Sequence, residues 1–222
     1  MNALRPTWDR AWGALRRVPP DAALDDLVAR YAEPHRTYHT AAHLVACFTT
    51  LDLVAHEAEH PPEVALALWF HDAVYDPRRT DNEARSGLLA RECLAAAGVE
   101  DSVIARVEAS ILATRHADEV ATGDARVVVD VDLSILGASA EVYDAYARGV
   151  RREYGWVDDA RFRAGRSAFL RGLLGRPRIF GTRALGARLE VPARANIRRE
   201  LAGLDGPVGD GAVGDGAMGG AR

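Results

Sequence analysis

The sequence predicts an all-helical protein. Apolar residues recur at intervals of three and four through most of the chain, which is typical of helices with one buried face. The segments that carry them are bounded by residues that commonly begin and end helices. Hydrophobic residues make up 48% of the 222 residues, enough for a buried core. A core of this size fits one domain, which we place at residues 1–204.

The first clear helical pattern begins at Thr40. Its buried face is marked by five apolar residues at spacings of three and four: Leu44, Cys47, Phe48, Leu51 and Val54. The following segment, residues 63–75, is apolar almost all round. We therefore expect it to form a central helix that packs on several sides.

A capping box predicts the start of the next helix. Thr80 is its N-cap residue, Glu83 reaches back to the N-cap backbone, and Gly98 ends the helix. Four more helices follow from similar signals: one capped by Asp101, one by Ser139, one that runs from Asp158 to Gly175, and a last one with Pro192 in its first turn.

Two segments do not fit this pattern. Residues 127–133 are rich in valine, and their local propensity favours a strand, which tertiary context can override; the pattern alone leaves the choice open. Residues 205–222 are mostly Gly, Ala, Asp and Val. So much glycine cannot recover its ordering entropy without a core to join, so we expect a flexible tail.

Charge and composition exclude several classes of protein. The chain has 28 basic and 32 acidic residues, a net charge of −4, which argues against a protein that grips nucleic acid through its overall charge. No secretory signal or apolar run long enough for a membrane span is visible. The two cysteines, Cys47 and Cys93, are expected to be buried thiols. We expect a cytoplasmic protein with no membrane partner, and leave a homodimer open.

Polar residues in apolar surroundings point to a metal site. His71 and Asp72 interrupt the most apolar segment of the chain, where an unpaired carboxylate would cost several kcal/mol. His43 lies on the buried stripe of its helix, and His39 lies one turn earlier. Together with the acidic residues at 130 and 132, these ligands from three elements suit a transition metal better than calcium.

The same residues carry a family resemblance. Residues 38–43 (YHTAAH), 69–72 (WFHD) and 130–133 (DVDL) resemble the ordered H…HD…D signature of the HD superfamily. The flanking segments 74–76, 81–83, 133–137 and 151–154 are similar to a bacterial branch described as metal-dependent phosphohydrolases. The resemblance spans residues 4–204. It implies an all-α HD-domain helical bundle, in which residues 127–133 would be helical.

The resemblance also implies a ligand set. The metal ligands would be His43, His71, Asp72 and Asp132, with Asp130 orienting a ligand or a water. The cofactor would be one divalent transition-metal ion per chain, one of Mn, Fe, Ni, Co and Zn. The implied reaction is hydrolysis of a small phosphorylated metabolite, such as a nucleotide, by a metal-activated water.

Further residues receive roles in this expected site. The catalytic candidates are Asp72 as proton acceptor, Asp76 and Glu83 near the attacking water, and His116, which we expect near the edge of a buried face. Arginine suits phosphate, and the candidates for substrate binding are Arg115, Arg151, Tyr38 and His39, with Arg166 as a further arginine. Each candidate also has a purely structural explanation.

Two other function classes remain open. The first is a regulatory or ligand-binding HD module that does not turn over substrate. The second is a di-iron oxygenase, which usually has two more histidines between the doublet and the last aspartate, where this chain has His116.

Overall fold

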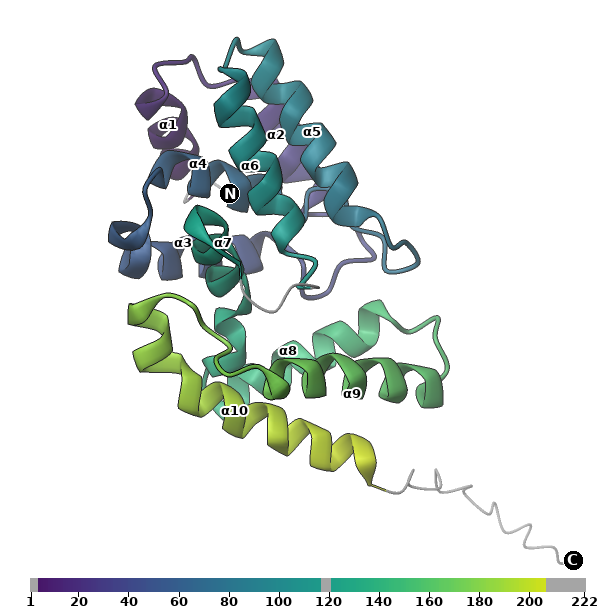
Figure 1. Cartoon of the computed structure of the whole chain (residues 1–222). Coiled ribbons are helices and arrows are strands. Elements are labelled where there is room, and N and C mark those ends of the chain that lie inside the picture. The colour runs from purple at the N-terminus through teal and green to yellow at the C-terminus, as the bar shows by residue number, and fades with distance from the viewer. Residues whose placement is uncertain (1–3, 117–120, 207–222) are drawn as a thin grey trace, which may run out of the picture.

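The computed structural model describes residues 4–116 and 121–206, and within them the protein is all-helical, as predicted (Figure 1). No strand occurs in this part of the chain. Its elements are α1 (Arg5–Ala14), α2 (Asp21–Arg30), α3 (Ala41–Val54), the 3₁₀ helix η1 (Ala55–Glu57), α4 (Pro61–Phe70), α5 (Asn82–Ala96), α6 (Asp101–Ala113), α7 (Gly123–Asp132), η2 (Leu133–Gly137), α8 (Ala140–Glu153), α9 (Asp159–Gly175) and α10 (Arg183–Asp205).

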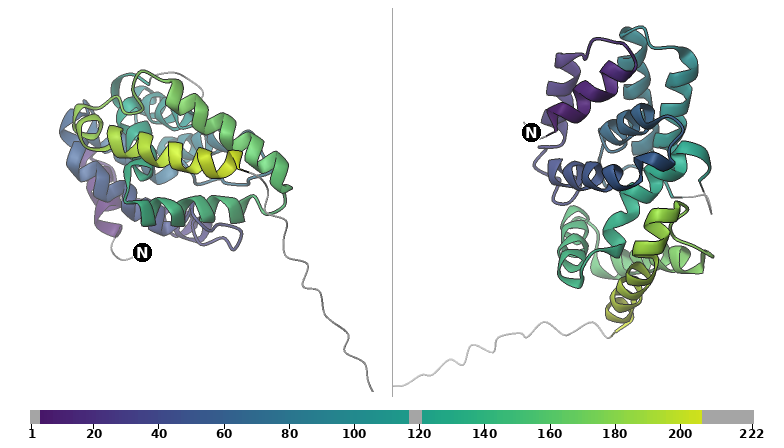
Figure 2. Two further views of the ribbon diagram at one scale, coloured as in Figure 1. Left: turned by 90° about the horizontal axis from the view of Figure 1, so that it is seen from below. Right: turned by 90° about the vertical axis from the view of Figure 1, so that its left-hand side faces the viewer.

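The helices form two groups with α7 between them (Figures 1 and 2). The first group contains α1 to α6, and the second contains α8, α9 and α10. Helix α4 is the centre of the first group, because it packs against α1, α3, α5, α6 and α7. Its Trp69 is fully buried and meets Trp8 of α1 with a ring separation of 5.4 Å. The apolar character of α4 therefore reflects neighbours on nearly every side.

Helix α4 ends at Phe70, five residues before the predicted end. Side chains form hydrogen bonds to the last carbonyl groups of the helix. His71 Nδ1 lies 2.8 Å from the Leu68 oxygen, and the Tyr31 hydroxyl donates to the Trp69 oxygen at 3.2 Å. These bonds satisfy carbonyls that have no partner at a helix end. His71 and Asp72 consequently lie just beyond the helix.

The valine-rich segment is helical, in α7. Val127, Val128 and Val131 are fully buried, so packing against the first group outweighs their strand propensity. Residues two apart on a helix differ in direction by about 200°. Asp130 and Asp132 therefore point to nearly opposite sides of α7.

Several predicted helix ends are confirmed. Thr40, Ser139 and Asp158 are N-cap residues whose side chains accept hydrogen bonds from the backbone of the first turn, and α9 ends at Gly175 as expected. Helices α1 and α2 lie outside the predicted set. Helix α6 is capped by Glu100, one residue before the predicted Asp101.

The capping box at Thr80 and Glu83 is wrong. Helix α5 begins at Asn82, and its N-cap residue Asp81 forms no side-chain cap. The reason lies in the preceding loop, because the Asn82 amide accepts from the Asp76 N–H at 3.1 Å and donates to the Asp76 oxygen at 2.9 Å. These contacts fix the loop and the helix start together.

The prediction that Pro192 lies in the first turn of the last helix is also wrong. Helix α10 begins nine residues earlier, at Arg183, so Pro192 lies inside it. Glu57 accepts the N–H groups of Arg183 and Ala184, both at 2.8 Å. This carboxylate satisfies the first donors of α10 from 126 residues away, which local sequence patterns do not reveal.

Helix α10 includes Asp205, the first residue of the predicted tail. Residues 207–222 of that tail lie outside the described residues. None of the helices described is sufficiently long and apolar to cross a membrane.

Candidate metal centre

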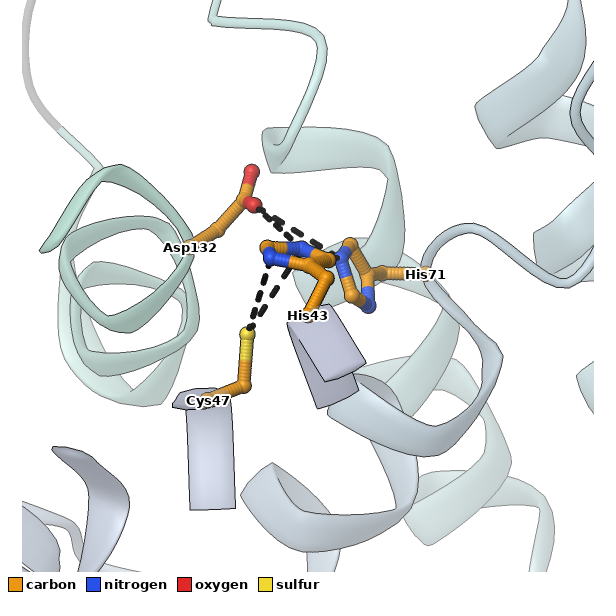
Figure 3. A group of neighbouring side chains, drawn as sticks. All are labelled: His43, Cys47, His71 and Asp132. Carbon is orange, nitrogen blue, oxygen red and sulfur yellow. Dashed lines mark hydrogen bonds and ion pairs between the residues drawn. The ribbon is translucent and has the colours of Figure 1, made fainter. Parts of the chain in front are cut away.

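Four predicted ligands converge from three elements. His43 lies in the first turn of α3, His71 and Asp72 follow α4, and Asp132 is the last residue of α7. Figure 3 shows His43, His71 and Asp132 pointing toward one another. His43 Nε2 lies 3.2 Å from His71 Nε2 and 3.2 Å from Asp132 Oδ1. Asp72 Oδ2 lies 3.1 Å from His71 Nε2 and 3.7 Å from His43 Nε2. His71 Nε2 and Asp132 Oδ1 are 3.6 Å apart.

These separations suit atoms that share one ion. Nitrogen and oxygen ligands bind a first-row metal at about 2.0–2.2 Å, which places neighbouring ligand atoms about 2.8–3.6 Å apart in octahedral or tetrahedral geometry. The separations of the five pairs given above run from 3.1 to 3.7 Å. The two histidine nitrogens and Asp132 Oδ1 are therefore close enough to share one cation, and Asp72 Oδ2 lies within reach of both histidines.

The tautomer of His71 also fits a metal ligand. Its Nδ1 donates to the Leu68 carbonyl, so in the neutral ring the lone pair lies on Nε2, which faces the other ligand atoms. A metal-binding histidine usually has its second nitrogen held in this way. The bond that ends α4 thus also orients the ring.

The site favours positive charge. Burial would lower the pKa of His71, but the carboxylates of Asp72 and Asp132 raise it well above its usual value. Burial would raise the pKa of Asp72, yet His71 and His39 lower it, and hydrogen bonds from His116, His43 and His71 lower that of Asp132. Two ionised carboxylates beside two buried imidazoles favour positive charge, which a proton on His71 can also supply. A divalent cation fits this preference.

Cys47 belongs to the same buried cluster, although the sequence suggested only a buried thiol. His43, Cys47, His71 and Asp132 present ligand atoms within 4.8 Å of one another and could hold a metal ion. The sulfur lies 3.6 Å from Nε2 and 3.8 Å from Nδ1 of His43. Its separation from Nε2 is similar to those between the predicted ligand atoms, so the thiol lies within reach of the same cation position (Figure 3). Burial, Asp132 and Asp72 raise its pKa well above the usual value.

His116 lies at the edge of the centre. Its Nε2 is 3.0 Å from Asp132 Oδ2, the oxygen that does not face His43. Its backbone has a φ of +55°, rare for a residue with a Cβ, and Arg176 donates to its carbonyl at 2.7 Å. His116 therefore orients a ligand carboxylate from the side opposite the histidine pair.

A network around Glu153 holds the segment that leads into α3. One oxygen of this buried carboxylate accepts the N–H groups of Thr37, Tyr38 and His39 at 2.6, 2.7 and 3.0 Å. The other lies 2.7 Å from His39 Nδ1 and accepts the Tyr75 hydroxyl at 2.8 Å. Burial would raise the pKa of Glu153, but these hydrogen bonds and the charge of His39 lower it to about 2. Glu153 lies in the segment 151–154 of the family resemblance, but the sequence analysis gave it no role.

Two predicted substrate residues lie in this network. Burial would lower the pKa of His39, but Asp72 and Glu153 raise it, so these carboxylates favour the charged form of the ring. Tyr38 packs against His43 and Tyr146, with ring separations of 4.9 and 4.6 Å.

Arg36 joins the two ligand-bearing segments. Its side chain is fully buried and donates to the carbonyls of His39, Asp72 and Ala73 at 3.2, 2.7 and 3.2 Å. One guanidinium group thus fixes the backbone at the doublet relative to the segment before α3. A fork with several donors is suited to this task. The sequence analysis did not single out Arg36.

The other candidates have different partners. Asp76 Oδ1 accepts the Arg78 N–H at 2.9 Å, within its own turn. Glu83 and Arg115 form a loose ion pair of 3.7 Å with each other. Arg151 donates to the carbonyls of Tyr154 and Val157 at 2.9 and 3.3 Å, and closes the loop between α8 and α9. None of these contacts reaches the four ligands.

Two further residues considered above also have structural partners. Asp130 accepts the N–H groups of Gly181 and Thr182 at 3.0 and 2.6 Å, on the side of α7 away from the centre. Arg166 forms a buried ion pair of 2.8 Å with Glu200.

Comparison of the chain with protein-family models, with curated proteins and with solved structures finds no match.

Proposed function

We propose that the protein is a metal-dependent phosphohydrolase of the HD type, which acts on a small phosphate ester. The observation that supports this most is the convergence of His43, His71, Asp72 and Asp132 within distances that suit one shared cation. Two histidines and two aspartates, in the order of the HD signature, come from three separate elements. This ligand chemistry matches Mn, Fe, Co, Ni or Zn.

The exposure of the four ligands suggests how substrate approaches. The side chains of His43 and His71 are at most 2% exposed, whereas those of Asp72 and Asp132 are 18% and 17% exposed. Water and substrate therefore reach the centre from its carboxylate side. A bound divalent cation supplies Lewis acidity there and lowers the pKa of nearby water.

Two side chains can handle protons on this open side. Asp72 contributes Oδ2 to the ligand cluster, and its Oδ1, with no hydrogen bond among the described residues, can accept a proton from the attacking water. His116, whose Nε2 lies 3.0 Å from Asp132 Oδ2, can exchange a proton with that carboxylate.

A cavity beside His116 offers room for the rest of the substrate. It has a volume of about 420 Å³ and is lined by His116, Phe169, Arg171 and Arg176 among others. None of the four predicted ligands lines it, and His116 connects it to Asp132. Arg171 pairs with Asp205, and Arg176 donates to the His116 carbonyl. The volume of the cavity lies in the range of ordinary small-molecule sites, about 300–1,000 Å³. Two arginines and one aromatic ring suit a phosphorylated small molecule better than an uncharged one.

A screen of phosphate esters with Mn, Co, Ni, Zn and Fe tests the proposal. We expect the wild type to release phosphate from at least one class of ester. Asp132→Asn should lose that activity by at least about a hundredfold, because it removes a ligand charge. The matched control is Asp144→Asn, since Asp144 is 49% exposed and pairs with Arg199 away from the centre.

Failure of the wild type to hydrolyse any ester with any of these metals would contradict the proposed activity. Full metal loading in that case would support a binding module that lacks turnover.

A further inference from the structure

A second cavity lies away from the metal centre. Its volume is about 260 Å³, and it is formed by Glu57, Arg126, Arg178, Gly181, Arg183 and Glu190 with three small neighbours. Arg126 lies in α7 six residues before Asp132, about 9 Å along the helix axis and about 120° around it. None of the four metal ligands lines the cavity.

Three arginines of this cavity lack side-chain partners. No hydrogen bond or ion pair joins the guanidinium group of Arg126, Arg178 or Arg183 to another side chain within residues 4–116 and 121–206. The Nε atom of Arg126 is buried without any acceptor in that part of the chain. The Arg126 residue is half-buried, and Arg178 and Arg183 are exposed. A buried N–H donor without an acceptor costs free energy, which a bound anion would recover.

The two carboxylates of the cavity are already engaged. Glu57 accepts the backbone N–H groups of Arg183 and Ala184. Glu190 accepts the N–H of Ile179 at 3.0 Å and pairs with Arg194 at 2.7 Å. Neither forms an ion pair with Arg126, Arg178 or Arg183. Positive charge therefore predominates in the cavity.

The local chemistry stabilises negative charge. Burial would raise the pKa of Glu57, but the backbone N–H groups of Ala184 and Arg183 and the charge of Arg126 lower it. An exogenous anion in the cavity would meet the three guanidinium groups, beside the engaged carboxylates of Glu57 and Glu190. Guanidinium forks match the oxygens of phosphate and carboxylate groups.

The backbone beside Arg126 is shaped to admit its side chain. A Cβ atom on Gly181 would lie 2.7 Å from Cγ and 2.8 Å from Cδ of Arg126, so a residue larger than glycine would displace the arginine stem. Asp130, one turn after Arg126, binds the N–H groups of Gly181 and Thr182 and fixes this close approach.

We propose that this cavity binds the phosphoryl group of a small anion at a site separate from the metal centre. Three guanidinium groups suit a dianion such as phosphate better than a single carboxylate. A volume of about 260 Å³ admits inorganic phosphate or a short phosphorylated compound, and it is below the usual size of a nucleotide-sized site.

The test uses the full-length protein as purified, labelled with ¹⁵N, and follows the side-chain Nε–H signal of Arg126. That signal is assigned by its absence in Arg126→Gln. Titration with inorganic phosphate should shift it saturably, and a parallel titration with glycerol phosphate shows whether an esterified phosphate also binds. Acetate should shift it far less.

Calorimetry with the same probes gives the affinities. Arg126→Gln and Gly181→Ala should each weaken phosphate binding by about tenfold or more, because a charge-assisted hydrogen bond is lost or displaced. The control is Arg188→Gln, an exposed arginine of α10 outside the cavity, which should bind like the wild type.

An unshifted Arg126 signal at saturating phosphate would overturn the proposal. Equal weakening by Arg188→Gln would also overturn it, because the binding would then reflect general surface charge. Neither outcome depends on catalytic turnover, so failure here is distinct from failure of the proposed hydrolase activity.

Discussion

At the scale of single residues, the sequence pointed to the four candidate ligands, but it gave no role to the groups that hold them in place. His71 and Asp72 attract notice because they interrupt an apolar segment, and the family resemblance selects Asp132 over Asp130. Glu153 contacts backbone groups up to 116 residues away. Neither spacing nor local composition reveals such a contact, because the partners meet only in the folded chain.

Glu153→Gln should lower the free energy of unfolding by about 2–3 kcal/mol at neutral pH. The amide can still accept backbone N–H groups, but it cannot pair with the charged ring of His39. Chemical denaturation of the variant and the wild type measures the difference. Glu92→Gln is the control, because Glu92 is exposed on α5.

The difference in unfolding free energy between the wild type and Glu153→Gln should depend on pH. The pKa of Glu153 is lowered from 4.5 to about 2, so its contribution is fully present above pH 4.5 and is lost as the pH falls toward 2. The stability gap between wild type and Glu153→Gln should therefore close across that window. A gap that stays constant down to pH 2 would show that the carboxylate charge is unimportant.

At the scale of helices, the periodicity of apolar residues predicted that a segment is helical better than it predicted where the helix begins and ends. Ser139 and Asp158 cap their helices as expected, because their bonds are local. Helix α4 ends early because Tyr31 and His71 satisfy its last carbonyls. Helix α10 starts early because the distant Glu57 satisfies its first N–H groups. Boundaries fixed by remote side chains are not visible in a local pattern.

A substitution at Gly137 tests how closely η2 and α10 pack against each other. A Cβ atom there would lie 2.6 Å from Leu189 Cβ and 3.1 Å from Leu189 Cα, so the two elements would have to separate. Gly137→Ala should destabilise the protein by about 1–3 kcal/mol. The control Gly172→Ala, inside α9 with no atom within 4 Å, should stabilise it by about 0.5–1 kcal/mol.

Thermal unfolding distinguishes these two alanine variants, since their melting temperatures should move in opposite directions. A Gly137→Ala variant as stable as the wild type would show that η2 and α10 can move apart without cost.

At the scale of the whole molecule, the candidate centre lies where the two groups of helices meet. The first group and α7 supply all four ligands, and α8 of the second group supplies Glu153, which fixes the segment before His43 (Figure 1). The all-helical class followed from the sequence pattern. The way in which α8 closes the centre depends on contacts between distant segments, so the sequence did not reveal it.

The metal content of the purified protein tests the central claim most directly. Elemental analysis should find about one transition-metal ion per wild-type chain. His71→Ala should lose it, whereas the exposed His56→Ala should retain it, because His56 is not among the clustered residues. Full metal content in His71→Ala, or two ions per wild-type chain, would contradict the mononuclear centre.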